Sequence, residues 1–215
     1  MGRLLISVMF FFSLTSYLEN NPKILIIGDS ISIGYTPFVQ AAMEGKADVF
    51  HNPGNAQHTG TGLEKIEEWI GDEPWDIIQF NWGLWDLCYR NPDSKLYGNR
   101  DKVNGQLTFT VQEYASNLDS IVTFMQSITE AKLIFVTTTY VPEKEAGRYK
   151  EDAIKYNAAA KKVMEKYGLV VHDVYNESIP IHYKFGKGVD DVHYSEEGYK
   201  KLADLITDFL RKEMR

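Results

Sequence analysis

The sequence contains a single cysteine, Cys88, among its 215 residues. One cysteine forms no disulfide within the chain and cannot by itself supply a cysteine-based metal cluster. We therefore expect Cys88 to be a small buried apolar side chain, and the fold to depend on its hydrophobic core. A chain of this length with 44% hydrophobic residues is long enough to bury one substantial core.

Positive charge is also scarce. The 23 lysines and arginines are outnumbered by 30 aspartates and glutamates, which gives a formal net charge of −7 and a pI near 5.3. Binding to nucleic-acid phosphates needs clusters of lysine and arginine, and the sequence has no such run. The composition therefore excludes nucleic acid as a partner and fits one globular domain.

Three common site signatures are absent. The chain has neither Gly-x-x-x-x-Gly-Lys-Ser/Thr nor Gly-x-Gly-x-x-Gly after its first apolar run, so no nucleotide phosphate site is expected. It also lacks the Gly-x-Ser-x-Gly elbow, which excludes the usual α/β-hydrolase arrangement.

A short apolar stretch opens the sequence. Arg3 provides a positive start, and residues 4–14 are apolar, with three consecutive phenylalanines. This pattern is typical of a secretory signal peptide and is too short for a comfortable membrane span. We predict a signal peptide over 1–16, a single domain over 17–215, and export to the periplasm or the extracellular space. Because no Ala-x-Ala cleavage pattern is present, an uncleaved anchor and a buried first strand or helix remain alternatives.

Short apolar runs alternate with longer amphipathic segments after residue 22. The runs predict five strands, at 24–27, 47–50, 76–80, 132–138 and 169–172. Apolar spacings of three and four predict helices at 61–70, 112–128, 150–167 and 195–212. This alternation predicts an α/β fold with a mostly parallel sheet covered on both faces. The polar segment 88–105 is expected to be an insertion or long surface loop beside the functional edge of the sheet.

Gly28-Asp29-Ser30 follows the first predicted strand directly. In a parallel sheet this turn lies at the carboxyl edge, where N–H groups at the start of the next helix can hold an oxyanion. A serine here suits a nucleophile, but Asp29 or Ser30 suits a helix cap equally well. The turn alone does not decide between the two roles.

Asp190 and His193 lie three residues apart, just before the last predicted helix. That spacing can place a carboxylate on Nδ1–H of the imidazole and leave Nε2 to take a proton from Ser30. Asp191 competes for the role of Asp190, but its spacing of two from His193 is expected to point it elsewhere. We therefore predict Ser30, Asp190 and His193 as the catalytic residues.

Four short blocks resemble, in order, those of the SGNH (GDSL-type) hydrolase superfamily. They are Gly28-Asp29-Ser30, Asn52-Pro53-Gly54, Gly83-x-x-Asp86 and Asp190-x-x-His193. The resemblance covers roughly residues 23–210. It implies a three-layer α/β/α sandwich around a five-stranded, flavodoxin-like sheet, and hydrolysis of carboxylic esters without a metal or other cofactor. It also implies Ser30 as the nucleophile, His193 as general base and then acid, and Asp190 as the group that orients His193.

The resemblance further implies an oxyanion hole formed by the N–H groups of Ser30 and Gly54 and by an asparagine side chain. Trp85 stands where the family has that asparagine. One such donor is worth about 3–4 kcal/mol of the barrier. A hole with two donors is one alternative. The candidates for a third donor are the side chain of Asn81, which we favour, the indole N–H of Trp85, and the side chains of Asn52 and Asn55.

Aromatic residues crowd the segments after the third and fourth predicted strands. Flat rings near a serine suit stacking on sugar faces, although packing in the core is the alternative for most of them. Together with the predicted export and the usual substrates of the resembled family, these aromatic residues predict an O-acetyl esterase that acts on a small-molecule or polysaccharide ester. The alternatives are a lipid- or thioester-directed acyl hydrolase and a non-catalytic glycan-binding relative. The aromatic residues predicted to bind substrate are Trp82, Trp85, Tyr89 and Tyr140.

Overall fold

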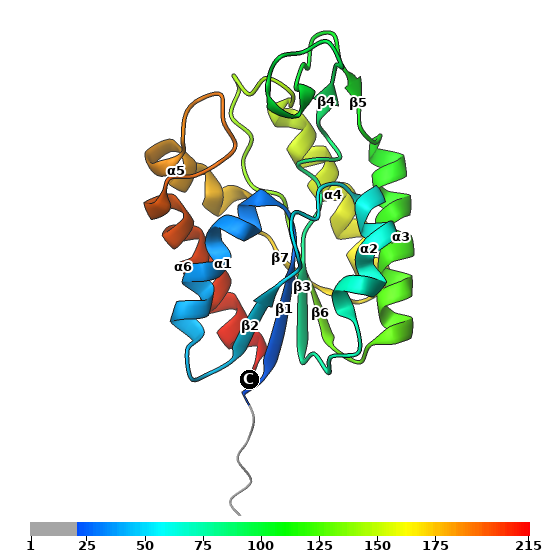
Figure 1. The fold of residues 1–215 in the computed structure, drawn as a ribbon, viewed down its shortest axis with the longest axis vertical. Helices are drawn as coiled ribbons and strands as arrows, with labels where there is room; N and C mark the ends of the chain where they lie inside the picture. Colours follow the sequence, from blue (N-terminus) through cyan, green and yellow to red (C-terminus); the bar gives the residue numbers. More distant parts are fainter. Residues whose placement is uncertain (1–20) are drawn as a thin grey trace, which may run out of the picture.

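A five-stranded parallel sheet lies between two layers of helices in the computed structural model, which describes residues 21–215 (Figure 1). The strand order is β2-β1-β3-β6-β7. This confirms the predicted α/β/α fold and its five strands, whereas the signal peptide predicted at 1–16 lies outside the described residues. The strands are β1 (Lys23–Ile27), β2 (Asp48–His51), β3 (Ile77–Phe80), β6 (Lys132–Val136) and β7 (Val170–His172).

Three helices cover each face of the sheet (Figure 1). One layer contains α1 (Ser30–Met43), α5 (Tyr175–Phe185) and α6 (Glu196–Glu213). The other contains α2 (Thr59–Ile70), α3 (Val111–Ile128) and α4 (Lys150–Lys166). The apolar spacing gave no signal for α1 and α5, because each contains a proline and buries polar side chains such as Ser32 and Ser178.

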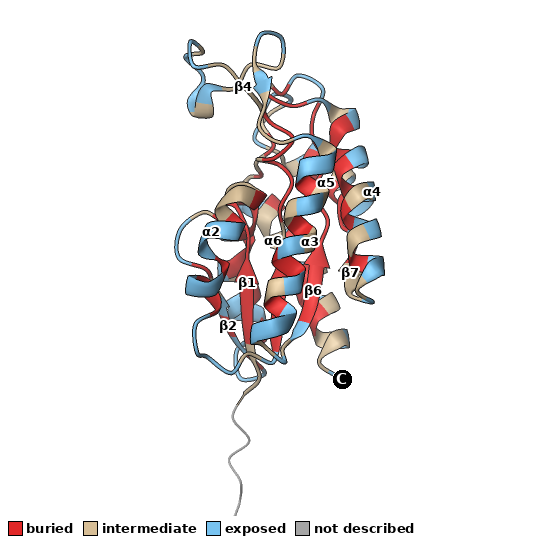
Figure 2. Cartoon of the chain, turned by 90° about the vertical axis from the view of Figure 1, so that its right-hand side faces the viewer, coloured by how far each residue is buried: buried red, intermediate tan, exposed pale blue. Residues whose placement is uncertain are grey.

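The sheet forms the centre of the hydrophobic core. Ile24, Ile26 and Ile27 of β1 are fully buried because helices cover both faces (Figure 2). Each buried isoleucine contributes roughly 1.5–3 kcal/mol relative to an exposed one. Cys88 is buried as well, as predicted. Among residues 21–215, no helix is long and apolar enough to cross a membrane.

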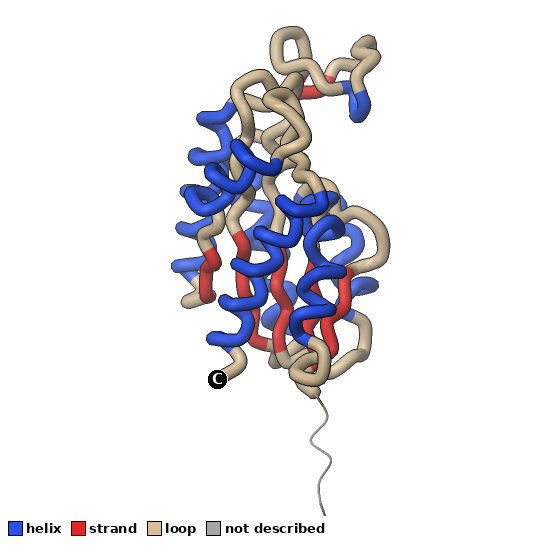
Figure 3. Tube along the Cα trace, turned by 90° about the vertical axis from the view of Figure 1, so that its left-hand side faces the viewer, coloured by secondary structure: helices blue, strands red, loops and turns tan. Residues whose placement is uncertain are grey.

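The chain between β3 and α3 leaves the sheet and forms a small lobe above its carboxyl edge (Figures 1 and 3). In this β4–β5 lobe (residues 88–109), β4 (Tyr89–Arg90) pairs antiparallel with β5 (Gln106–Leu107), and the 3-10 helix η1 (Tyr97–Asn99) lies between them. The Tyr89 N–H donates to Gly147 O at 2.7 Å, which fastens the lobe to the main body. The predicted surface loop is therefore an ordered ribbon.

Candidate active site

In the turn after β1, Asp29 caps the helix and Ser30 carries a free hydroxyl. Asp29 is the N-cap of α1, and its Oδ1 accepts a hydrogen bond from the Ile31 N–H at 2.9 Å. A Cβ on Gly28 would lie only 2.6 Å from the Ser32 Oγ, so the turn needs a glycine. Because Asp29 caps the helix, the hydroxyl of Ser30 is available for another role.

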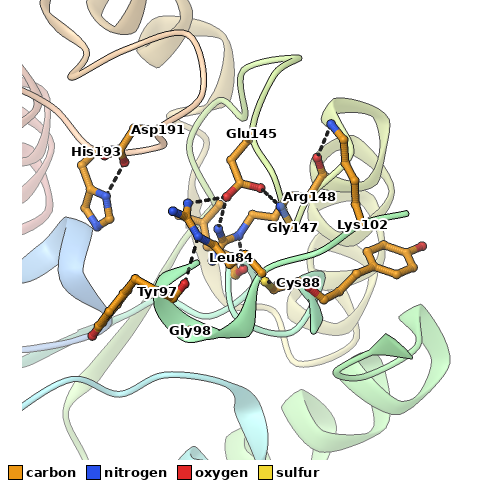
Figure 4. Close-up of polar contacts among 12 residues, drawn as sticks. Leu84, Cys88, Tyr97, Gly98, Lys102, Glu145, Gly147, Arg148, Asp191 and His193 are labelled. Atoms are coloured by element: carbon orange, nitrogen blue, oxygen red, sulfur yellow. Dashed lines mark hydrogen bonds and ion pairs between the residues drawn. The ribbon is translucent and has the colours of Figure 1, made fainter. Parts of the chain in front are cut away.

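Ser30 meets His193 and a carboxylate at the carboxyl edge of the sheet. The Ser30 Oγ lies 2.9 Å from Nε2 of His193. The other ring nitrogen, Nδ1, lies 2.5 Å from Oδ1 of Asp191 (Figure 4). A hydroxyl, an imidazole and a carboxylate in this order are the arrangement that activates a serine.

The prediction that Asp190 orients His193 is wrong, because Asp191 makes that contact. Oδ1 of Asp191 also accepts the His193 backbone N–H at 2.9 Å, so the side chain folds back over a tight turn. A spacing of two suits this local side-chain-to-backbone bond. Asp190 is exposed, and its Oδ1 approaches Gly188. Burial acts to raise the pKa of Asp191, but the hydrogen bonds from His193 outweigh burial and lower it.

A second serine–histidine contact lies close by and differs in its surroundings. The Ser32 Oγ lies 2.7 Å from Nε2 of His51, and it donates to Asp29 O at 2.8 Å. Nδ1 of His51 faces the carbonyl of Asn52 rather than a carboxylate. Ser32 is buried and does not line the pocket in front of Ser30. This contact therefore supports the start of α1 and lacks the carboxylate of a triad.

The resemblance implied backbone donors at Ser30, which lines the pocket, and at Gly54, which precedes the pocket residue Asn55. Ser30 is the first residue of α1, where the N–H has no partner within the helix and the helix dipole favours negative charge. Gly54 has φ 70°, a left-handed conformation that favours glycine. Asn52 joins the two loops, since its Oδ1 accepts the Gly28 N–H at 2.9 Å and its Nδ2 donates to Gly54 O at 3.3 Å. Asn52 is thereby engaged in holding the loops together.

Asn81 is not the third donor that we favoured. Its Nδ2 donates to Val136 O at 2.7 Å, toward β6. It lines a narrow internal cavity together with Ser32 and Thr138, not the pocket of Ser30. Its place at the end of β3, next to the strand that precedes Ser30, suggested proximity, but the side chain turns to β6 instead.

Asn55 and Trp85 both line the pocket of Ser30. Oδ1 of Asn55 accepts the Gln57 N–H at 2.8 Å, which fixes the amide and leaves its Nδ2 without a partner among residues 21–215. The Trp85 ring lies under the Arg90 guanidinium, 4.5 Å from its carbon. The Trp85 indole N–H likewise has no hydrogen-bond partner among the described residues, so Asn55, which directly follows Gly54, and Trp85 are the two side-chain donors that this pocket offers.

Replacement of the third donor is expected to slow the chemical step. Asn55→Ala should lower kcat for p-nitrophenyl acetate about 100-fold with a small change in KM, as loss of one oxyanion donor does elsewhere. Trp85→Phe keeps a ring and loses the N–H, and Asn81→Ala removes the group that faces β6. Both should retain most of kcat. A 100-fold loss in Trp85→Phe with none in Asn55→Ala would assign the donor to the indole.

The pocket in front of Ser30 and His193 has a volume of about 290 Å³. Of the four aromatic residues predicted to bind substrate, only Trp85 lines it. Trp82 is fully buried and donates to Ala56 O, and Tyr89 points to Asp152. Tyr140 is buried beside a separate pocket with Tyr183. Three of the four predictions are therefore wrong, because these rings pack in the core or brace the lobe.

Several other residues of the pocket carry no signal in the sequence. Tyr97, an exposed ring on η1, lines it, as do Arg90, Arg100 and Arg148. The arginines come from distant segments, so no local motif marks them. Figure 4 shows Arg148 and Tyr97 in the same region as Asp191 and His193.

Asp86, the aspartate of the third block, has a structural role. Asp86 is buried, and its Oδ1 accepts hydrogen bonds from the N–H and the hydroxyl of Thr59 at 2.9 and 2.5 Å. Burial raises the pKa of Asp86 to about 7, against the opposing effect of these two bonds. Asp86 thus ties the segment after β3 to the start of α2.

The parallel sheet and the Ser30–His193–Asp191 arrangement at its carboxyl edge define a hydrolase of the serine type. The chain belongs to the GDSL-like lipase/acylhydrolase family, whose model matches residues 24–206. It is therefore an acyl hydrolase, as the resemblance implied.

Solved structures share this fold at low sequence identity. A lipase/acylhydrolase from Enterococcus faecalis superposes with a TM-score of 0.70 at 20% identity, over 89% of this chain and 96% of its own. The acetyl xylan esterase AlAXEase gives 0.69 at 15% identity, over 87% and 99%. Axe2, an acetylxylan esterase from Geobacillus stearothermophilus, gives 0.64 at 18% identity, over 88% and 93%. The comparison with curated proteins found no match.

Proposed function

We propose that this protein is a serine esterase that removes acetyl groups from carbohydrate through an acyl-enzyme. The observation that carries the proposal is the chain of contacts from Ser30 Oγ through His193 to Asp191, at 2.9 and 2.5 Å. Ser30 attacks the ester carbonyl while Nε2 of His193 takes the hydroxyl proton. Asp191 holds the imidazole by Nδ1–H and stabilises the imidazolium that forms.

The attack forms a tetrahedral intermediate, and the reaction then proceeds through loss of the alcohol and hydrolysis of the acyl-enzyme. The tetrahedral oxyanion is held by the N–H groups of Ser30 and Gly54 and by Nδ2 of Asn55. When the carbon–oxygen bond to the alcohol breaks, His193 returns the proton to the leaving oxygen. Water, deprotonated by His193, next attacks the acyl-serine and releases the acid and the free serine.

The acetyl and carbohydrate preferences have their own support. Trp85 and Tyr97 line the pocket and provide faces on which a sugar ring can stack. Two of the structures with this fold are acetyl xylan esterases by name. The predicted signal peptide favours a substrate that lies outside the cytoplasm. Among residues 21–215, no three histidine, cysteine, aspartate or glutamate side chains are grouped as a metal site would need.

A panel of esters tests this function. We expect kcat/KM to be highest for p-nitrophenyl acetate and to fall at least about tenfold by the octanoate, and acetate to be released from an acetylated polysaccharide. A chelator in the assay should leave these rates unchanged. A kcat/KM that rises with chain length would favour the lipid-directed alternative. Binding of the polysaccharide with no turnover of any ester would favour a non-catalytic glycan-binding protein.

A further inference from the structure

Three arginines from separate segments converge on the pocket of Ser30. Arg90 comes from β4, Arg100 follows η1, and Arg148 lies just before α4. We call them the arginine cluster. The protein as a whole carries a formal net charge of −7, so this concentration of positive charge runs against its composition.

One carboxylate is shared by two members of the cluster. Glu145 is fully buried, and its Oε1 accepts from Nη1 of Arg100 at 2.6 Å and from Nη1 of Arg148 at 3.0 Å. Its Oε2 accepts the Gly147 N–H at 2.8 Å (Figure 4). Both oxygens of Glu145 are therefore occupied, and its single negative charge offsets one of the two cations.

Arg90 has no carboxylate partner among residues 21–215. Its guanidinium donates to two neutral oxygens, Gly98 O and the Thr108 Oγ1, and lies over the Trp85 ring. Burial lowers the pKa of Arg90, and the charges of Arg148 and Arg100 lower it further, but a guanidinium stays protonated at neutral pH. Arg90 is thus a half-buried cation that no carboxylate contacts directly, although the charge of Glu145 acts on it from nearby.

The other two carboxylates of the pocket feel the charges of Arg148 and Arg100 but form no ion pair with the cluster. Asp29 accepts the Ile31 N–H at the start of α1, and Asp191 holds His193. Within the described chain, the Nη2 group of each arginine in the cluster makes no hydrogen bond to the protein. The cluster therefore presents free guanidinium donors, and one cation without an ion-pair partner, beside the nucleophile.

We propose that the arginine cluster binds an anionic group of the substrate, so that Ser30 deacylates an acidic sugar that carries a carboxylate or a phosphate. This inference rests on the proposed esterase function and narrows its substrate class. Guanidinium groups bind carboxylate and phosphate oxygens in pairs of parallel hydrogen bonds. Arg90 lies over the Trp85 ring, 4.5 Å from its centroid, and both side chains line the pocket in which the anionic group would bind.

Matched pairs of substrates test the charge directly. One pair is O-acetylated glucuronic acid and its neutral amide, O-acetylated glucuronamide; the other is O-acetylated glucose 6-phosphate and O-acetylated glucose. We expect kcat/KM to favour the anionic member of at least one pair by about tenfold or more, since hydrogen bonds to charged groups are the stronger ones. The pair with the larger ratio identifies the anion as carboxylate or phosphate.

Two variants locate the effect. Arg90→Gln should reduce the anion preference to about threefold or less, because it removes the unpaired cation. Lys95→Gln removes a positive charge from an exposed position of the same lobe outside the pocket, and should keep the preference of the wild type. Inhibition of the wild type by glucuronate and glucose 6-phosphate, each against its neutral counterpart, tests the same charge without any substitution.

The outcomes separate the inference from the function on which it rests. Hydrolysis of p-nitrophenyl acetate with equal kcat/KM within both pairs, and no stronger inhibition by either anion, would overturn the anion site and leave the esterase standing. An equal loss of the anion preference in Arg90→Gln and Lys95→Gln would show that the preference comes from the overall charge of the lobe. That result would also overturn the anion site. No turnover of any ester would overturn both.

Discussion

Ser30→Ala is expected to lower kcat for p-nitrophenyl acetate by a factor of about 10³ or more. Alanine removes the hydroxyl that lies 2.9 Å from Nε2 of His193, and with it the atom that forms the acyl-enzyme. The backbone donors and the pocket remain, so a small residual rate over the uncatalysed reaction is expected. The measurement is the steady-state rate, together with the burst of p-nitrophenol that reports acylation.

Ser32→Ala is the matched control for this substitution. Ser32 lies on the same helix, two residues on, and it also contacts a histidine, at 2.7 Å. Because it is buried away from the pocket, its loss should affect stability more than turnover. Undiminished hydrolysis by Ser30→Ala, or an equal loss of kcat in Ser32→Ala, would contradict the assignment of the nucleophile.

Asp191→Asn is expected to lower kcat by about 10³- to 10⁴-fold, with little change in fold. An amide in place of the carboxylate removes the negative charge that stabilises the imidazolium. It also permits the tautomer of His193 in which Nε2 carries the proton and accepts none from Ser30. The rate of p-nitrophenyl acetate hydrolysis measures this loss, and thermal unfolding checks that the protein remains folded.

The neighbouring aspartate supplies the control. Asp190→Asn makes the same chemical change one residue earlier, on an exposed side chain that does not contact the His193 ring. Turnover should stay close to that of the wild type. If Asp190→Asn instead shows the large loss and Asp191→Asn does not, the original assignment from the Asp-x-x-His spacing would be restored.

The elements that place Ser30 and His193 followed from local patterns. A buried strand that ends at Gly28 predicts a turn at the carboxyl edge, and the apolar stripe of α6 predicts a helix just after His193. Local patterns did not decide between Asp190 and Asp191, because the choice depends on the conformation of one turn. In that turn, the Asp191 side chain bonds both the ring and the N–H of His193. A spacing argument does not resolve which of two adjacent carboxylates turns inward.

The walls of the pocket were harder to predict, for a related reason. Asn81 and Tyr140 follow strands and were expected to face the nucleophile, yet Asn81 bonds to a neighbouring strand and Tyr140 packs in the core. No local motif predicts the arginine cluster, because its members are separated by 10 to 58 positions. They come together only in the folded protein, through Glu145 and the lobe. Long-range packing, not local pattern, sets these side chains.

The β4–β5 lobe separates the two tasks of the enzyme along the chain. The groups that break the ester bond stand at the start of α1, just after β1, and on the turn before α6, both outside the lobe. Two of the three arginines belong to the lobe, which sits as one insertion between β3 and α3. We therefore expect that exchange of this single insertion would change substrate recognition and leave the groups for hydrolysis in place.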